Sequence, residues 1–238
     1  MIKNIPVVIL CGGYGTRISE ETKLKPKPMI LIGKKPILSH IIDIYKHYGF
    51  NKFILALGYK SNYVKKYFSN KSSKNLSLIY TGKDTMTGGR LLRLKRYLEN
   101  YKTFMLTYGD GVSSINIKKL LTFHQSHGKI ATITATRPPV RFGELKLTKS
   151  LVNSFKEKPQ ASSGWINGGF FVFNKEIFNF IESDKTMLEK EPLENLVKKK
   201  QLLAFKHTGF WQCMDTMRDK MYLNKLLKSG KCPWKKMK

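Results

Sequence analysis

The stretch IPVVILCGGYGTR, residues 5–17, decides the fold of this chain. Its first part, Ile5–Cys11, is an apolar run of the length expected for a strand that is buried on both faces. Three glycines follow within four residues, and Arg17 ends the stretch. In open α/β sheets, ligands bind beyond the carboxyl ends of the strands, where glycines let the backbone pass close to them. The stretch therefore predicts an α/β fold with a ligand site at this loop.

The glycine loop matches neither of the two familiar glycine fingerprints. A dinucleotide loop needs a third glycine where Ile18 stands, and a P-loop needs a lysine directly after its last glycine. Fixed positive charge comes instead from Arg17 and Lys27, and Pro26 and Pro28 stiffen the segment around Lys27. This combination favours a site for the anionic oxygens of a phosphate. A plain glycine turn followed by solvated lysines is the alternative.

Strand-like runs alternate with helical ones along the chain, which is the pattern of a largely parallel sheet with crossover helices. Up to residue 136 we expect further strands at Lys52–Leu57, Leu76–Tyr80, Thr103–Tyr108 and Ala131–Ala135, and helices at Pro36–Tyr48, Asn62–Phe68, Gly89–Tyr97 and Asn116–His127. After residue 136 we expect strands at Glu144–Leu147, Leu151–Glu157, Gly169–Asn174 and Leu202–Lys206, and helices at Glu191–Lys199 and Thr216–Leu227. We predict one domain, residues 1–238, folded as a Rossmann-like αβα sandwich with a mainly parallel, mixed sheet.

The net charge of +28 invites comparison with nucleic-acid-binding proteins. Only seven of the 44 basic residues are arginine, however, and the lysines are scattered along the whole chain. Such scatter is typical of a solvated, lysine-rich surface, so we expect no specific nucleic-acid partner. A regulatory or nucleic-acid-binding protein is the alternative that the charge leaves open.

Cysteine usage and hydropathy bear on the location of the protein. Cys11, Cys213 and Cys232 form no C-x-x-C pair, and an odd number of cysteines suits a reducing compartment. The longest apolar run near the start, residues 5–10, is far too short to span a bilayer. We therefore expect a cytoplasmic protein without a membrane partner, a disulfide framework or a zinc site.

Two aspartates stand where a hard cation could be held. Asp110 lies in Gly109-Asp110-Gly111 at the end of a predicted strand, and Asp215 lies just ahead of the last predicted helix. Mg²⁺ is typically held by one or two carboxylates together with substrate phosphates. The two aspartates together favour a metal–phosphate site. The alternatives are an Asp-Gly turn at Asp110 and a helix N-cap at Asp215.

Three further segments could contact a ligand. Arg90 lies in the first turn of a predicted helix in TMTGGRLLR (85–93), where helix N-termini attract anions. Glu157 and Lys158, in FKEKP (155–159), could accept a hydroxyl and meet a phosphate, and Asn167 stands at a glycine pair in GWINGGFFVF (164–173). His124 and His127 are read as surface or packing residues, because no histidine completes a metal or Ser-His-Asp pattern.

Two motifs together carry a resemblance to a known family. Gly12–Arg17 reads G-G-x-G-T-R, and after seven residues Lys25–Met29 reads K-P-K-P-M. In this order and spacing the chain resembles the nucleoside-diphosphate-sugar pyrophosphorylases. The segments TMTGGRL (85–91), TYGDGVS (107–113), GWINGGFFV (164–172) and GFWQ (209–212) resemble its glucose-1-phosphate cytidylyltransferase branch. The resemblance covers nearly the whole chain.

The resemblance implies the nucleotide-diphospho-sugar transferase fold and a transfer from CTP to glucose 1-phosphate that yields CDP-glucose and pyrophosphate for surface polysaccharide. It implies a nucleotide-binding half (1–136), an acceptor half with a helical end (137–238) and a homo-oligomer. The implied nucleotide contacts are Leu10, Cys11, Gly12, Gly13, Tyr14, Gly15, Thr16, Arg17, Lys27, Thr85, Arg90 and Gly109. Of these, Arg17 and Lys27 would be catalytic together with Asp110. Asp110 and Asp215 would hold Mg²⁺, and the acceptor would meet Gly143, Glu157, Lys158 and Asn167, with Lys158 on the sugar phosphate.

The chain departs from this branch in one segment. Only Ser69–Ile79 separates YVKKYF (63–68) from YTGKDTMTGG (80–89), and the branch usually carries a longer stretch here. The shortening bears on oligomer contacts and on the acceptor. The alternative acceptors are another sugar 1-phosphate or a non-sugar phosphate such as L-glutamine phosphate.

Overall fold

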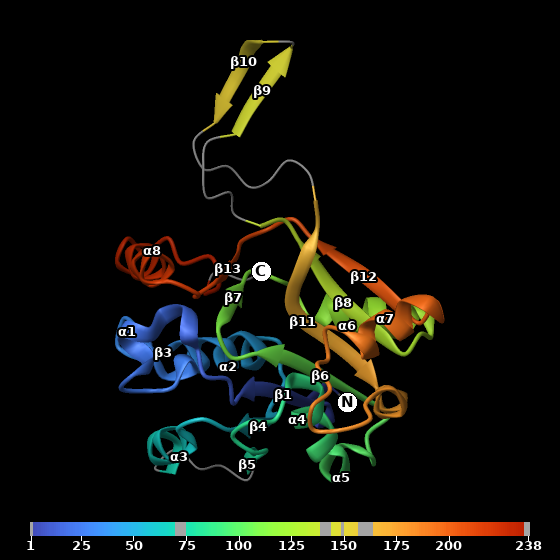
Figure 1. The fold of residues 1–238 in the computed structure, drawn as a ribbon. Helices are drawn as coiled ribbons and strands as arrows, with labels where there is room; N and C mark the ends of the chain where they lie inside the picture. The colour runs from blue at the N-terminus through green and yellow to red at the C-terminus, as the bar shows by residue number, and fades with distance from the viewer. Residues whose placement is uncertain (1, 70–74, 139–143, 149, 157–163, 236–238) are drawn as a thin grey trace.

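A seven-stranded, mainly parallel sheet forms the centre of the molecule in a computed structural model that describes residues 2–69, 75–138, 144–148, 150–156 and 164–235 (Figure 1). The strand order is β12-β8-β11-β6-β1-β4-β5. Its strands are β1 (Pro6–Cys11), β4 (Lys52–Leu57), β5 (Leu76–Tyr80), β6 (Thr103–Tyr108), β8 (Ala131–Thr136), β11 (Ile166–Asn174) and β12 (Leu202–His207). Two-stranded sheets pair β2 (Leu31–Ile32) with β3 (Lys35–Pro36), β7 (Gly111–Ser113) with β13 (Trp211–Cys213), and β9 (Glu144–Thr148) with β10 (Leu151–Lys156).

The order of the strands fixes where a ligand can bind. From β1 the chain moves outward to β4 and β5, all parallel, and β6 then returns to the other side of β1, also parallel. β11 runs antiparallel between β6 and β8. The direction of winding therefore reverses between β1 and β6, and in such sheets the crevice at the carboxyl ends of these two strands is the place where ligands bind.

Helices cover both faces of the sheet, as the predicted sandwich requires (Figure 1). Alternate residues of β1 enter opposite cores: Val7 and Ile9 pack in one, and Val8 and Leu10 in the other. The first core includes residues of α2 (Ile37–His47), α3 (Ser61–Ser69), α6 (Ile117–His127) and α8 (Met217–Lys228). The second includes residues of α4 (Thr87–Arg93), α5 (Lys95–Leu98), α7 (Glu191–Lys198) and the 3₁₀ helix η4 (Lys175–Phe180).

The structure confirms the predicted αβα sandwich and refines its local detail. The helix predicted at Gly89–Tyr97 is two helices, α4 and α5, and both stay on the sheet because Leu91 and Leu98 are buried in the same core. The pairing of β7 with β13 was not predicted, since each strand is only three residues long. Short segments also surround the glycine loop: α1 (Ser19–Thr22) and the 3₁₀ helices η1 (Ile2–Asn4), η2 (Thr16–Ile18) and η3 (Lys27–Met29).

The N-cap alternative for Asp215 is wrong. Thr216 is the N-cap of α8, because its hydroxyl accepts from the amide of Asp219 while the Asp219 side chain accepts from the Thr216 amide. Asp215 is therefore left outside the helix. In the described ranges, no helix is both long and apolar enough to cross a membrane.

Four histidines are held in their neutral form by the fold. Burial lowers the pKa of His40, His124, His127 and His207 more than their hydrogen bonds raise it. His124, for example, bonds the Thr132 hydroxyl (2.9 Å) and the Asn174 side chain (3.1 Å). Both histidines singled out in the sequence, His124 and His127, are thus packing residues of the β8–α6 contact.

Acidification is expected to destabilise the fold through these histidines. The unfolded chain binds protons at a pKa near 6.5, and the folded chain only at a lower pH. Their stabilising contribution is therefore complete above about pH 6.5 and is lost as the pH falls, by up to about 1.4 kcal/mol per pH unit for each histidine. Urea unfolding between pH 7.5 and 5.5 measures this slope. H124N should reduce the slope, and a slope equal to that of the unchanged chain would contradict the assignment.

Candidate active site

A cavity of about 660 Å³ opens at the carboxyl ends of β1 and β6, a volume within the usual range for small-ligand sites. It brings together every predicted site residue that the structure describes: Leu10, Cys11, Gly12, Gly13, Tyr14, Gly15, Thr16, Arg17, Lys27, Thr85, Arg90, Gly109, Asp110, Asn167 and Asp215. Gly143, Glu157 and Lys158 lie outside the described residues. Residues far apart in sequence thus share one crevice at the reversal point of the sheet.

The glycine loop leaves β1 with its backbone close to the neighbouring elements. Gly15 has a φ of +66°, in the left-handed region, and its carbonyl accepts a hydrogen bond from the Thr22 hydroxyl (3.1 Å). A Cβ at Gly15 would lie 2.9 Å from the Cβ of Lys27, so the loop can sit directly over the lysine stem only because residue 15 is a glycine. Among the residues that the structure describes, none beyond the chain neighbours of Gly13 has an atom within 4 Å of the position that a Cβ on Gly13 would occupy, so the backbone there faces open space in the cavity.

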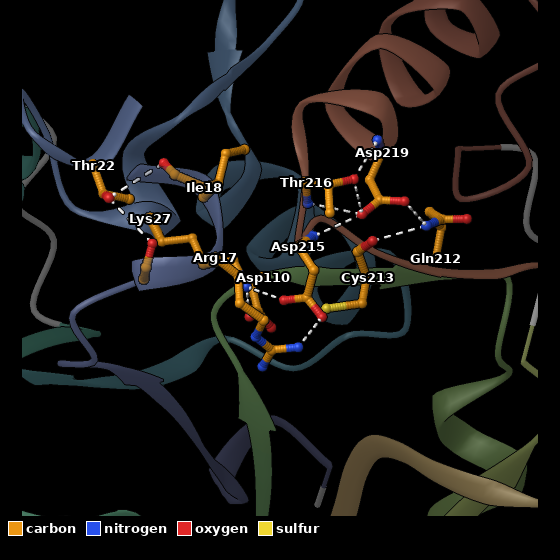
Figure 2. Close-up of polar contacts among 11 residues, drawn as sticks. Arg17, Ile18, Thr22, Lys27, Asp110, Gln212, Cys213, Asp215, Thr216 and Asp219 are labelled. Carbon is orange, nitrogen blue, oxygen red and sulfur yellow. Dashed lines mark hydrogen bonds and ion pairs between the residues drawn. The ribbon is translucent and has the colours of Figure 1, made fainter. Parts of the chain in front are cut away.

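Four charged side chains form a compact cluster at one end of the cavity (Figure 2). The Lys27 ammonium lies 2.6 Å from a carboxylate oxygen of Asp110 and 2.5 Å from one of Asp215. The Arg17 guanidinium lies 2.5 Å from the other oxygen of Asp215. The cluster joins the glycine loop and η3 to the strand ends of β6 and β13, and its formal charges sum to zero.

The cluster controls the ionisation of its members. Burial alone would raise the pKa of Asp215, but the hydrogen bond and charge of Lys27, with the charge of Arg17, lower it below its ordinary value. Burial would lower the pKa of Lys27, but the charge of Asp110 and the bonds to both aspartates raise it. Lys27 therefore stays an ammonium, and Asp215 stays a carboxylate, across the neutral pH range.

The ligand atoms of Asp110 and Asp215, together with the Cys213 thiol, lie within 4.8 Å of one another. Two carboxylates at this separation are the oxygen donors that Mg²⁺ prefers, so this part of the cavity fits the predicted ion. Cys213 was not predicted. It is the last residue of β13, and the pairing of β13 with β7 places it opposite Gly111, next to Asp110. The sequence around Cys213 gives no pattern that would predict this pairing.

Arg90 is engaged with the backbone around the cavity. Its guanidinium is buried and donates to the carbonyls of Gly12 (2.9 Å), Gly82 (2.6 Å) and Lys83 (3.1 Å). It also donates to the Leu57 carbonyl and the Thr81 hydroxyl. Arg90 therefore ties the glycine loop to the carboxyl ends of β4 and β5. A Cβ on Gly12 would overlap this guanidinium, which explains the glycine at the start of the loop.

A second group of polar residues lines the same cavity, and the sequence did not predict two of them, Glu189 and Tyr108. Glu189 accepts hydrogen bonds from the Tyr108 hydroxyl and from the Thr87 hydroxyl (2.6 Å). Asn167 lies beside it, with its amide 3.4 Å from the Tyr108 hydroxyl and its own oxygen accepting from the Gly169 amide (2.8 Å). These residues present a carboxylate, a phenol and an amide, which are groups suited to sugar hydroxyls.

The family model for nucleotidyl transferases matches residues 6–225, which include all the cavity residues described above. The chain belongs to the nucleotidyl transferase family. Its charged cluster and its glycine loop therefore belong to a nucleotidyl transferase fold, and the predicted family and fold class are confirmed.

Individual relatives agree with this membership. The chain is 47% identical to the glucose-1-phosphate cytidylyltransferase of Salmonella typhimurium, with 96% of this chain and 98% of the relative aligned. It is 42% identical to the probable glucose-1-phosphate cytidylyltransferase of Bacillus subtilis over the same shares. The crystal structure of HddC from Yersinia pseudotuberculosis superposes with a TM-score of 0.73 at 26% identity, and the match covers 94% of this chain and 99% of that one.

Proposed function

We propose that this protein is a glucose-1-phosphate cytidylyltransferase that joins CTP and glucose 1-phosphate to give CDP-glucose and pyrophosphate. The observation that carries the proposal is the 47% identity to the Salmonella enzyme along essentially the full length of both chains. The cavity supports it, since both cationic groups and groups that can bind sugar hydroxyls line it. Its proposed role is to supply a precursor of surface polysaccharide.

The transfer needs positioning and charge neutralisation, with no covalent enzyme intermediate. An oxygen of the sugar phosphate attacks the α-phosphorus of CTP, the bond to the β-phosphate breaks, and pyrophosphate leaves. In our proposal Lys27 neutralises the α-phosphate, Arg17 binds the departing phosphates, and the amides of the glycine loop hold the nucleotide. Asp110 and Asp215 would hold Mg²⁺, which supplies charge neutralisation between the two phosphorylated substrates when bound.

The polar residues around Glu189 give the second half of the proposal. Asn167 would donate to or accept from the sugar hydroxyls, Glu189 would accept from them, and the Tyr108 hydroxyl holds Glu189 in place by donating to its carboxylate. Lys158 would bind the acceptor phosphate and Glu157 and Gly143 would lie near the sugar, as the family resemblance implies. We also propose a cytoplasmic location, because the three cysteines are thiols and not disulfides, and a homo-oligomer, because Leu151 and Val152 expose apolar side chains on the β9–β10 hairpin.

Pyrophosphate release tests the proposed reaction. We expect rapid release with CTP, Mg²⁺ and glucose 1-phosphate, and at least about tenfold lower kcat/KM with ATP, GTP or UTP, or with galactose or mannose 1-phosphate. L-Glutamine phosphate belongs in the same panel. Release only with another acceptor would overturn glucose 1-phosphate, and no release with any pair would overturn the enzyme. Binding to duplex DNA that persists at 200 mM salt would favour the nucleic-acid alternative.

A further inference from the structure

The Lys27 ammonium occupies the space between the two carboxylates that form the metal-binding part of the site. It lies 2.6 Å from Asp110 and 2.5 Å from Asp215, and the side chain is only 9% exposed (Figure 2). A divalent cation held by both aspartates would compete with this ammonium for the same carboxylate charge. At such short range, in a partly buried site, the repulsion between the two cations is strong.

The backbone that carries Lys27 is fixed, so any adjustment must come from the side chain. Pro26 and Pro28 flank the lysine in η3, and its stem packs under Gly15. The ammonium end, in contrast, faces the cavity in which the phosphates of a nucleotide would lie. Small torsion changes along the stem can therefore move the charge from the aspartates toward a phosphate while the loop stays in place.

We propose that Lys27 is an internal counterion that opposes divalent-cation binding to Asp110 and Asp215 until the phosphates of a nucleotide draw its ammonium away. The proposal rests on the proposed nucleotidyl transfer. The formal charges of Arg17, Lys27, Asp110 and Asp215 sum to zero, and a divalent cation alone would raise the sum to +2. A triphosphate supplies the missing negative charge. Metal and nucleotide thus strengthen each other's binding, and such coupling is reciprocal.

Electron paramagnetic resonance of Mn²⁺ in the absence of nucleotide tests the counterion directly. We expect K27Q to bind Mn²⁺ about tenfold or more tightly than the unchanged chain, since the competing charge is gone. K27R keeps the charge and should bind as weakly as the unchanged chain. Adding D110N to K27Q should abolish the gain. A K27Q affinity equal to that of the unchanged chain would overturn the proposal.

Two control variants separate competition from a general loss of positive charge. K35Q removes an ammonium that pairs with Asp43 outside the cavity, at 55% exposure, and should leave Mn²⁺ binding unchanged. R17Q removes the guanidinium that pairs with the other oxygen of Asp215. Because the Arg17 side chain is 73% exposed, R17Q should increase Mn²⁺ affinity less than K27Q does. Equal gains in K27Q, R17Q and K35Q would overturn the specific role of Lys27.

CTP binding with and without Mn²⁺ is measured separately from turnover. Failure of the counterion proposal can then be distinguished from failure of the proposed reaction. In the unchanged chain, CTP should bind more tightly with Mn²⁺ than without it, and K27Q should lose most of this coupling. If CTP does not bind at all, the proposed function fails while the nucleotide-free Mn²⁺ result still decides the counterion. If circular dichroism shows that K27Q does not fold, K27M takes its place, because methionine keeps the buried stem. A larger rise in Tm on adding Mn²⁺ in K27M than in the unchanged chain supports the proposal. An equal rise in Tm overturns it.

Discussion

Asp110→Asn is expected to reduce kcat by a factor on the order of 10³ while leaving the fold intact. The substitution removes one of the two carboxylates that face the Lys27 ammonium and fit a divalent cation. Lys27 keeps its 2.5 Å contact with Asp215, and the Asp110 carbonyl keeps its bond from the Met214 amide (2.9 Å), so the strand ends of β6 and β13 remain joined. The measurement is steady-state pyrophosphate release, with circular dichroism and thermal unfolding on the same preparation.

Asp43→Asn is the matched control. Asp43 lies in α2, pairs with Lys35 and is half exposed, so the same chemical change there should leave kcat within about twofold. An Asp110→Asn enzyme that retained more than a tenth of the activity would contradict a metal or phosphate role at this position. Loss of activity with a collapsed circular dichroism spectrum would instead point to a structural role.

The parts of the site that follow from the sequence are those built by local chain geometry. A buried strand followed by glycines predicted the loop after β1, and the Gly109-Asp110-Gly111 turn predicted a carboxylate at the end of β6. Parallel strands bring their carboxyl ends to one edge, so these two segments were expected to meet. Pro26 and Pro28 stiffen the segment around Lys27, which predicted that the Lys27 ammonium has a defined position. The glycine loop, Lys27 and Gly109–Gly111 all line the cavity.

What the sequence did not predict depends on contacts between distant segments. Glu189 lies between η4 and α7 and reaches the cavity because Thr87 and Tyr108, from two other elements, bind its carboxylate. Cys213 enters through the three-residue pairing of β7 with β13, which is too short to leave a periodic pattern. Arg90 was predicted as an anion contact at a helix start, a role that stays a prediction. The carbonyls it binds come from three separate segments: the glycine loop, the end of β4 and the loop after β5.

Arg90→Met is expected to lower the free energy of unfolding by about 1–3 kcal/mol and to raise the KM for the nucleotide. The buried guanidinium donates to the carbonyls of Gly12, Leu57, Gly82 and Lys83. Methionine would remove this donor from all four, and within the described residues only Gly12 and Leu57 keep another one, the amides of Tyr59 and Thr81. Because Gly12 begins the loop at the cavity, loss of its bond to Arg90 loosens the backbone that would bind the nucleotide. Urea unfolding and pyrophosphate-release kinetics measure the two effects.

Arg93→Met is the control that separates a buried arginine from an exposed one, since Arg93 lies three residues further along α4. Arg93 pairs with Asp184 at the surface, where its side chain is 44% exposed, and such pairs contribute about 0–1 kcal/mol. Arg90→Lys keeps the charge but offers one nitrogen where the guanidinium uses two, so it should recover only part of the loss. If Arg90→Met were no less stable than Arg93→Met, the carbonyl contacts of Arg90 would not hold the loop. If stability fell while the KM for the nucleotide stayed unchanged, Arg90 would support the fold alone and would not position the glycine loop.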